Sequence, residues 1–182
     1  VLSCTMNLML TIVFGTCFHI QAPARSESTP KLEDLKQALN TEGPFWVNMR
    51  NYSSDQDCSI WFKLYLRKDS YLFVSRYKNG QREVKQEKLK AKLVTEGGQP
   101  TMKIHRSGQK ETSCLLKFWS SNEKCAIFQY LDGPCEQRIW DSKVGSNLSS
   151  CDSEYSTLCG KAKYTLNKEK CIDPSASSIG SS

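Results

Sequence analysis

Histidine is scarce in this sequence, which contains only His19 and His105 among its 182 residues. The Gly-x-Ser-x-Gly and His-Glu-x-x-His motifs of common hydrolases are absent, and so is a phosphate-binding loop. A Ser-His-Asp or Cys-His catalytic arrangement would have to use one of these two histidines. His105 lies in an ordinary strand-like segment, so we predict that the protein is not an enzyme.

Closely spaced cysteine pairs are also lacking, because none of the nine cysteines belongs to a Cys-x-x-Cys motif. Zinc ribbons and thioredoxin-like redox sites need that spacing. We therefore expect neither a metal site nor a cofactor, and we interpret the chain as a binding protein.

Charged residues are missing from residues 1–24, which hold no Asp, Glu, Lys or Arg. The apolar stretch from Met6 ends in Ala-Pro-Ala at 22–24, which matches the A-x-A signature of signal-peptide cleavage. It is too short to supply the roughly 20 apolar residues of a transmembrane helix. We predict that residues 1–24 are a signal peptide, and that the protein is secreted and has no membrane span. Residues 1–5 lack a positive charge, so an alternative is that they precede a true start at Met6.

Removal of that segment would take Cys4 and Cys17 with it and leave seven of the nine cysteines. In an oxidising compartment these cysteines are expected to form disulfides, and their odd number leaves one thiol over. The sequons at Asn51 and Asn147, each with a serine two residues later, are predicted N-glycosylation sites.

The net charge is +6, and the densest basic run covers residues 82–92 (REVKQEKLKAK). Glu83 and Glu87 interrupt its lysines, so we interpret this run as a solvated face of a strand or loop. On that interpretation no nucleic-acid partner is expected.

The part of the chain after the signal peptide has the length of one ordinary domain. Residues 25–31 form a polar leader without an apolar period, and we predict that they are flexible. Leu32, Leu35 and Leu39 recur at helical spacing and predict a short helix that ends before Gly43-Pro44.

Eight strand-like runs follow, separated by turn signals such as Asn79-Gly80. Their residue types and alternation predict strands over residues 45–52, 58–67, 71–77, 88–93, 101–106, 114–119, 125–131 and 136–140. In the second run, one predicted face consists of Cys58, Ile60, Phe62, Leu64 and Leu66. The other consists of Trp61, Lys63, Tyr65 and Arg67.

A polar segment over residues 147–159 predicts a second helix, which ends at Gly160. Short antiparallel runs with a helix before and after them fit a closed up-and-down barrel. An eight-stranded barrel can hold one small ligand in its interior. The pattern alone does not distinguish such a barrel from a two-sheet sandwich.

The order of certain residues in the last third of the chain carries a family resemblance. The set consists of Cys125, Cys135-Glu136 with Trp140, Cys151, Cys159-Gly160, Tyr164 and Cys171, preceded upstream by FWVNMRNYSSDQDC at 45–58. It resembles the tick salivary lipocalins, the family that includes the histamine-binding proteins. The resemblance implies an all-β domain over residues 32–171, namely an eight-stranded antiparallel lipocalin-type barrel with a short N-terminal helix and a C-terminal helix. We predict a disordered tail over residues 172–182.

The family pattern also implies the disulfides Cys58–Cys171, Cys125–Cys151 and Cys135–Cys159. Spacing alone does not choose among the many connectivities that six cysteines allow. Cys114 then has no partner and is expected to be a buried, unreactive thiol in a monomeric protein. The alternative is an intermolecular bridge that gives a covalent dimer.

The resemblance implies that the protein sequesters a small host mediator and so helps to evade host defence. The family's default ligand is a biogenic amine such as histamine or serotonin, held by a Cys-Asp-aliphatic triplet and a Glu-Leu-Trp triplet. Here Ala126 replaces that Asp, and two extra residues separate Glu136 from Trp140. A buried ammonium group needs a paired carboxylate. Two alternatives therefore stay open: a lipid mediator such as a leukotriene or fatty acid, or surface antagonism of a host protein such as a complement component.

Glu136 is the one acid in register with the family's Glu-Leu-Trp motif, although Asp69, Glu83 or Glu87 could also point inward. Aromatic side chains can hold an ammonium group by cation–π contact. The predicted ligand-contacting residues are therefore Glu136, Trp140, Trp46, Trp61, Tyr65, Phe73, Phe118 and Tyr130.

Overall fold

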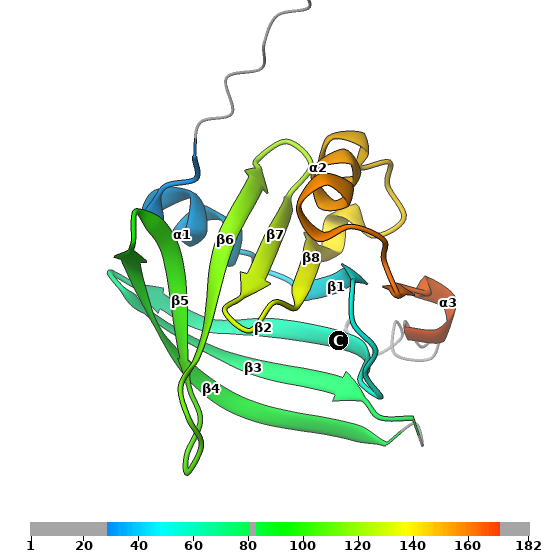
Figure 1. Ribbon diagram of the computed structural model, residues 1–182. Helices are drawn as coiled ribbons and strands as arrows, with labels where there is room; N and C mark the ends of the chain where they lie inside the picture. Colours follow the sequence, from blue (N-terminus) through cyan, green and yellow to red (C-terminus); the bar gives the residue numbers. More distant parts are fainter. Residues whose placement is uncertain (1–28, 81–82, 172–182) are drawn as a thin grey trace, which may run out of the picture.

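The structure, a computed structural model, describes residues 29–80 and 83–171 (Figure 1). The predicted signal peptide, most of the leader and the tail lie outside the described residues. Eight strands match the eight predicted runs to within a few residues at each end. They are β1 (Phe45–Arg50), β2 (Asp57–Arg67), β3 (Ser70–Lys78), β4 (Val84–Glu96), β5 (Gln99–His105), β6 (Thr112–Ser120), β7 (Cys125–Tyr130) and β8 (Cys135–Trp140).

The sheet closes on itself. Each strand from β2 to β7 pairs antiparallel with the strand that follows it, and β1 pairs with both β8 and β2. The contact between β1 and β2 is short, with Phe45 opposite Trp61. Farther along, β1 pairs instead with β9 (Tyr164–Thr165). The predicted eight-stranded antiparallel barrel is therefore confirmed, and the sandwich is excluded.

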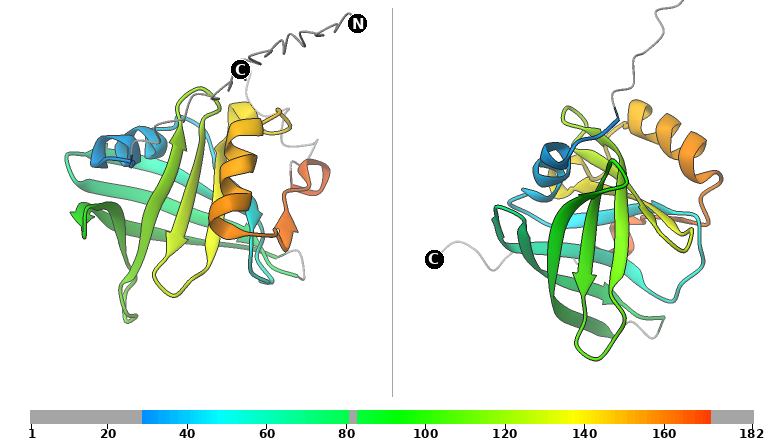
Figure 2. Two further views of the ribbon diagram at one scale, coloured as in Figure 1. Left: turned by 45° about the horizontal axis from the view of Figure 1, so that its top comes forward. Right: turned by 60° about the vertical axis from the view of Figure 1, so that its left-hand side comes forward.

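Helix α1 (Leu32–Leu39) lies across one end of the barrel (Figure 2). Its apolar face, which includes Leu35 and Leu39, is fully buried against the interior. Nε1 of Trp140 donates a hydrogen bond to the carbonyl of Ala38 at 3.0 Å, which fixes the last turn of the helix. The predicted N-terminal helix is confirmed and closes this end of the barrel.

Helix α2 (Ser149–Cys159) packs on the outside of β6, β7 and β8 (Figure 2). Glu123 accepts hydrogen bonds from the backbone N–H groups of residues 150 and 151, at 3.0 and 2.8 Å. An acid at this position is favourable because the N-terminus of a helix carries partial positive charge. The helix ends where the sequence predicts, and Gly160 adopts a positive φ of 72°. Among the described residues, no helix has the length and apolar character needed to span a membrane.

Three disulfides tie the C-terminal segment to the barrel. Two of them hold α2 against β7 and β8, and the third joins β2 to α3 (Lys168–Cys171). They are the pairs that the family resemblance implies: Cys125–Cys151, Cys135–Cys159 and Cys58–Cys171.

A β-bulge in β2 changes which side chains face the interior. The pairing register with β3 shifts between Lys63 and Tyr65, so Leu64 is an extra residue and is 49% exposed. Ile60 belongs to the outer core beneath α2, whereas Leu66 packs against the interior. The predicted single face that includes these residues is wrong, because an extra residue reverses the alternation of side chains.

A second bulge has the same effect in β6, where the register with β7 shifts between Leu116 and Phe118. Cys114 and Leu116 face the interior, but Phe118 packs in the outer core and Trp119 packs against the interior. The bulge thus removes one predicted ligand contact from the barrel.

Candidate ligand-binding site in the barrel interior

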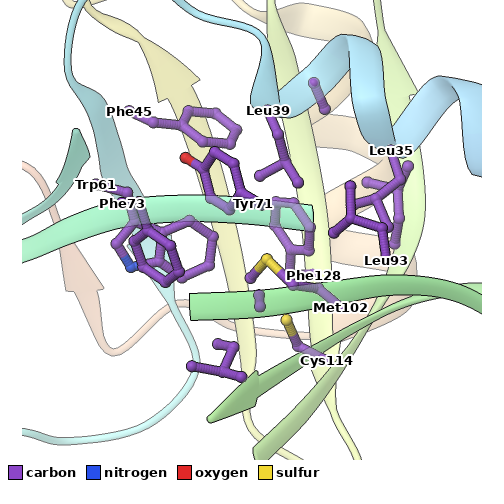
Figure 3. Packing of buried hydrophobic residues seen from close by; sticks show 14 of the residues in the cluster. Leu35, Leu39, Phe45, Trp61, Tyr71, Phe73, Leu93, Met102, Cys114 and Phe128 are labelled. Atoms are coloured by element: carbon purple, nitrogen blue, oxygen red, sulfur yellow. The ribbon is translucent and has the colours of Figure 1, made fainter. Parts of the chain in front are cut away.

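The interior is lined by apolar and aromatic side chains (Figure 3). Tyr71 stacks on Phe73 with ring centroids 4.8 Å apart, and Trp61 lies 5.1 Å from Phe73. Met102 and Phe128 are 0% exposed, which leaves no water-sized space beside them. The interior is therefore filled in this state, and a ligand would have to move side chains aside to enter. The flexible thioether of Met102 is suited to such repacking.

A buried ion pair interrupts this apolar lining. Arg138 donates to Oε2 of Glu136 from Nε at 2.9 Å and from Nη2 at 2.7 Å. Both residues belong to β8 and lie two positions apart, so their side chains share the interior face. Arg138 is 2% exposed and Glu136 is 4% exposed. The acid that matches the family motif therefore faces the interior, but its charge already has a partner.

The carboxylate of Glu136 already accepts four hydrogen bonds. Tyr130 donates its hydroxyl to Glu136 at 3.3 Å, and Tyr52 donates to the other carboxylate oxygen through a shorter contact. Together with two N–H groups of Arg138, this places three donors on Oε2 and one on Oε1, so one lone-pair site of Oε1 remains open. Burial, and then the charge of Glu136, raise the pKa of both phenols, which therefore remain protonated donors.

Donor groups, in contrast, remain unused in the interior. The guanidinium of Arg138 lies 3.5 Å from the ring centroid of Trp61, and Nη1 donates to the Phe45 carbonyl at 3.3 Å. A guanidinium has five N–H groups, and the hydrogen bonds within the described residues engage three of them. The buried hydroxyl of Tyr71 has no hydrogen-bond partner there either. Burial raises the pKa of Tyr71, so this hydroxyl also stays protonated.

The position of the family's amine-site Asp faces the same part of the interior. Ala126, which stands there in this chain, is 0% exposed and lies directly opposite Arg138 in the β7–β8 ladder. The chain thus has an alanine beside a guanidinium where the family motif has a carboxylate. The interior ion pair is electrically neutral as a whole, and its carboxylate already accepts four hydrogen bonds.

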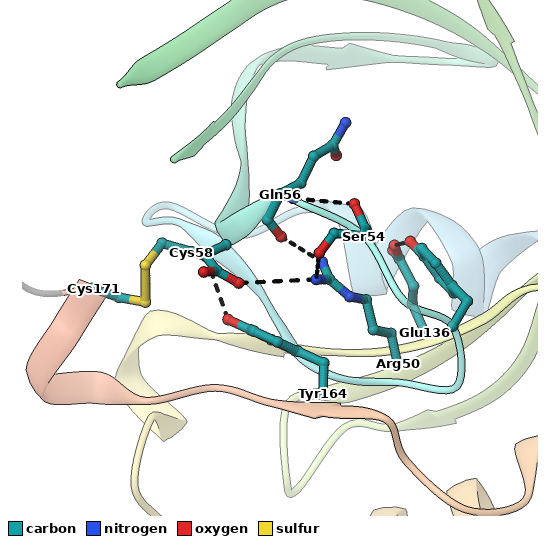
Figure 4. A network of polar contacts seen from close by, with 9 residues as sticks. Arg50, Ser54, Gln56, Cys58, Glu136, Tyr164 and Cys171 are labelled. Carbon is teal, nitrogen blue, oxygen red and sulfur yellow. Dashed lines mark hydrogen bonds and ion pairs between the residues drawn. A yellow bond between two sulfur atoms is a disulfide. The ribbon is translucent and has the colours of Figure 1, made fainter. Parts of the chain in front are cut away.

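The loop over residues 51–56 joins β1 to β2 and lies beside Arg50 (Figure 4). Arg50 holds this loop, because its Nη1 donates to the Gln56 carbonyl and its Nη2 donates to the Ser54 carbonyl at 3.0 Å. The guanidinium also lies 4.2 Å from the ring centroid of Tyr164. This anchoring places Tyr52 of the loop against the buried carboxylate.

The structure brings only some of the predicted ligand contacts together. Trp61, Phe73, Tyr130 and Glu136 line the interior, and Trp140 packs against it at the α1 end. Trp46 and Phe118 instead belong to the outer core beneath α2, and Tyr65 is 38% exposed on the surface. The alternative acids Asp69, Glu83 and Glu87 are exposed as well.

Two interior residues were not singled out from the sequence. The position of Arg138 could have been predicted, because it alternates with Glu136 and Trp140 along the strand and therefore shares their face. The position of Tyr52 could not: the strand predicted over residues 45–52 included it, but β1 ends at Arg50 and Tyr52 lies in the loop that follows. Its position depends on the fold around Arg50 rather than on a local pattern.

His105 does not contribute to this site. It is exposed on the outer face of β5, and its Nε2 lies 3.2 Å from Oε2 of Glu111. It therefore does not face a molecule held in the interior. Across residues 29–80 and 83–171, no three His, Cys, Asp or Glu side chains gather into a potential metal site.

Cys114 provides a test of the closed interior. It is a free thiol with 0% exposure, and burial, followed by the charge of Glu136, raises its pKa. Because the thiolate is the reactive form, we expect iodoacetamide at pH 8 to leave Cys114 unmodified in the native protein. Modification should follow unfolding in guanidinium, as measured by mass spectrometry. Rapid labelling of the native protein, or a covalent dimer through Cys114, would contradict this prediction.

The two sequons differ in their surroundings. Asn51 is half-buried, and its side chain donates to the Cys159 carbonyl at 3.1 Å and accepts from the Cys135 N–H at 3.0 Å. Asn147 is exposed just before α2. We expect a glycan at Asn147 and none at Asn51 when the protein is secreted from insect cells.

Single substitutions test which of the two sequons carries the glycan. Asn147→Gln should remove the glycan mass without a change in stability. Asn51→Gln should leave the glycan in place and lower the free energy of unfolding by about 1–2 kcal/mol, because two part-buried backbone groups lose a partner. A glycopeptide that contains Asn51 would overturn this assignment.

Comparisons with known proteins support the fold. No family model matches the chain, and no curated protein sequence matches it. The crystal structure of AM182 in complex with serotonin is similar, with a TM-score of 0.59 and 14% identity over 76% of this chain and 92% of that chain. Japanin from Rhipicephalus appendiculatus, bound to cholesterol, has a TM-score of 0.57 and 13% identity over 74% of this chain and 98% of its own. These likenesses show the fold, and they agree with the lipocalin-type barrel that the sequence resemblance implied.

Proposed function

We propose that the protein is a secreted lipocalin of the tick salivary type, which sequesters one small host mediator inside its barrel. The ordered cysteine pattern and the closed eight-stranded barrel support this proposal. Two proteins of similar fold were solved with small molecules, serotonin in one case and cholesterol in the other. Three disulfides also fit an oxidising compartment outside the cytoplasm.

The interior favours a lipid mediator over an amine. The observation that carries this choice is the balance of hydrogen-bonding groups: among the described residues, two N–H groups of Arg138 and the hydroxyl of Tyr71 have no partner, while Glu136 already accepts four hydrogen bonds. A buried donor without a partner is costly. An apolar ligand with one acceptor group, such as the carboxylate of a fatty acid or leukotriene or the oxygen of a sterol, supplies what is missing.

A biogenic amine is the second candidate, because Glu136 does face the interior and one protein of similar fold was solved with serotonin. An ammonium group, however, is a donor only. At the carboxylate it would share Oε1 with Tyr52 or compete with Tyr130 and Arg138 for Oε2. The aromatic face of Trp61 is also taken, since the guanidinium of Arg138 lies over it.

Isothermal titration tests the choice. Arachidonic acid, a leukotriene and cholesterol represent lipids, and histamine and serotonin represent amines. We expect one-to-one binding of at least one lipid at micromolar concentration or below, and no binding of either amine in that range. Saturable amine binding without lipid binding would select the second candidate, and binding of none would reject sequestration of these mediators.

A pair of tyrosine substitutions locates the polar end of the ligand. Tyr71→Phe removes the unused interior hydroxyl, whereas Tyr155→Phe removes an equally unpartnered hydroxyl in the outer core. We expect the first substitution to weaken lipid binding about fivefold, which corresponds to about 1 kcal/mol. The second should leave affinity unchanged. Equal affinity in both variants would place the polar end of the ligand elsewhere.

A further inference from the structure

The outer face of β4 carries a row of exposed lysines. Lys88, Lys90 and Lys92 point outward, and they alternate with Leu89 and Leu93, which are buried in the interior. Alternate residues of a strand lie roughly 7 Å apart, so the three ammonium groups follow a line along the strand. Helix α2 packs against β6, β7 and β8 and leaves this face open (Figure 1).

This row borders a hollow in the surface. In the sheet, Lys90 lies opposite His105 of β5, and Lys92 lies between Ser70 of β3 and Lys103 of β5. A hollow of about 420 Å³ forms at this place. It is lined by Asp69, Ser70, Lys90, Ala91, Lys92 and His105.

Glu96 and Glu111 on this face contact other basic residues rather than the row, whereas Asp69 lines the hollow itself. Lys103 pairs with Glu96 at 3.0 Å and lies 3.9 Å from Glu111, which also contacts His105. Within the described part of the chain, Lys88, Lys90 and Lys92 take part in no ion pair. Two unit charges at roughly 7 Å repel each other by about 0.6 kcal/mol in water. A linear polyanion would relieve this repulsion at all three positions.

We infer that the face formed by β3, β4 and β5 binds a sulfated polysaccharide of the heparin type. The regular row suits a chain with repeated anionic groups, and the hollow beside it, where Asp69 would repel a sulfate, gives an uncharged part of a sugar ring a concave seat. This site is independent of the barrel interior. It would retain the protein on cell surfaces or matrix while the interior holds its ligand.

Other polyanions fit this face less well. Single-stranded nucleic acid is bound by several aromatic side chains on which bases stack, and among the described residues the large exposed apolar side chains include only one aromatic, Tyr65. An anionic membrane would need apolar side chains to insert, whereas the hollow has only Ala91. The disulfides also fit a compartment outside the cytoplasm, where sulfated polysaccharides occur.

The test compares two variants that lose the same charge. Lys88→Gln/Lys90→Gln/Lys92→Gln removes the row, and Lys110→Gln/Lys161→Gln/Lys163→Gln removes three exposed lysines elsewhere. Affinity for immobilised heparin is measured by surface plasmon resonance at several salt concentrations. We expect the row variant to lose at least about tenfold in affinity and the control less than about threefold. The slope of log affinity against log salt should fall by about two to three only in the row variant, by analogy with counterion release from other polyanions.

Additional variants and ligands serve as controls for this test. Lys88→Arg/Lys90→Arg/Lys92→Arg should retain heparin binding, because the charges are kept, and all variants should bind the barrel ligand as the wild type does. Equal losses in the row and control variants would show attraction by net charge alone and overturn the inference. Stronger binding to phosphatidylserine vesicles or single-stranded RNA than to heparin would overturn it as well.

Discussion

The variant Glu136→Gln is expected to lower the free energy of unfolding by about 3–5 kcal/mol, because it leaves the charge of Arg138 buried without a counterion. Arg138 is 2% exposed, and β8 holds it inside the closed barrel, so it has no route to solvent. Glutamine also presents an NH₂ group at a position where the carboxylate now accepts from Tyr52, Tyr130 and Arg138, so these hydrogen bonds have to be rearranged. Urea denaturation, followed by tryptophan fluorescence, measures the change.

The double variant Glu136→Gln/Arg138→Met provides the control. Replacing both members of a buried ion pair is often nearly neutral, because the cost of desolvating both charges disappears with them. We expect the double variant to recover most of the stability that Glu136→Gln loses. A double variant that is less stable than Glu136→Gln would show that the pair is not coupled as the distances indicate.

Removal of the Cys58–Cys171 disulfide is expected to have the second large effect. It closes a loop with a sequence separation of 113, against 26 and 24 for the other two disulfides. In the chain-entropy model such a loop contributes about 4–5 kcal/mol, and the shorter loops about 3–4 kcal/mol each. This bond also holds the end of the segment in which Tyr164 packs on Arg50.

The free energy of unfolding of paired serine variants, measured under non-reducing conditions, ranks the contributions of the disulfides. We expect Cys58→Ser/Cys171→Ser to be destabilised more than Cys125→Ser/Cys151→Ser, with Tyr164 losing its contact as the segment detaches. Non-reducing peptide mapping of the wild type should recover the same three bridges. A bridge that contains Cys114, or an equal loss of stability in both variants, would contradict this prediction.

Local patterns were sufficient to predict the strands, because a period of two residues and turn signals such as Asn79-Gly80 depend on neighbouring residues only. Closure of the barrel was not predictable in this way. It requires β1 to pair with both β8 and β2, which are distant in sequence. The family resemblance supplied that long-range information.

The site was predicted less completely than the fold, for two physical reasons. Bulges at Leu64 and between Leu116 and Phe118 reverse the alternation, and one extra residue leaves no periodic signal by which to place it. The hydrogen bonding of the Glu136 carboxylate was also not predictable from the sequence. Its position followed from the motif, but the four hydrogen bonds that it accepts come from β8 itself, from Tyr130 of β7 and from Tyr52 of the loop after β1.

Native mass spectrometry of the protein with an equimolar mixture of cholesterol, arachidonic acid, a leukotriene, histamine and serotonin tests the proposed ligand class most directly. The unused donors of Arg138 and Tyr71 predict a one-to-one complex with one of the lipids, and this complex should be weakened in Tyr71→Phe. A complex with histamine or serotonin in preference to every lipid, or free protein alone, would contradict the proposal.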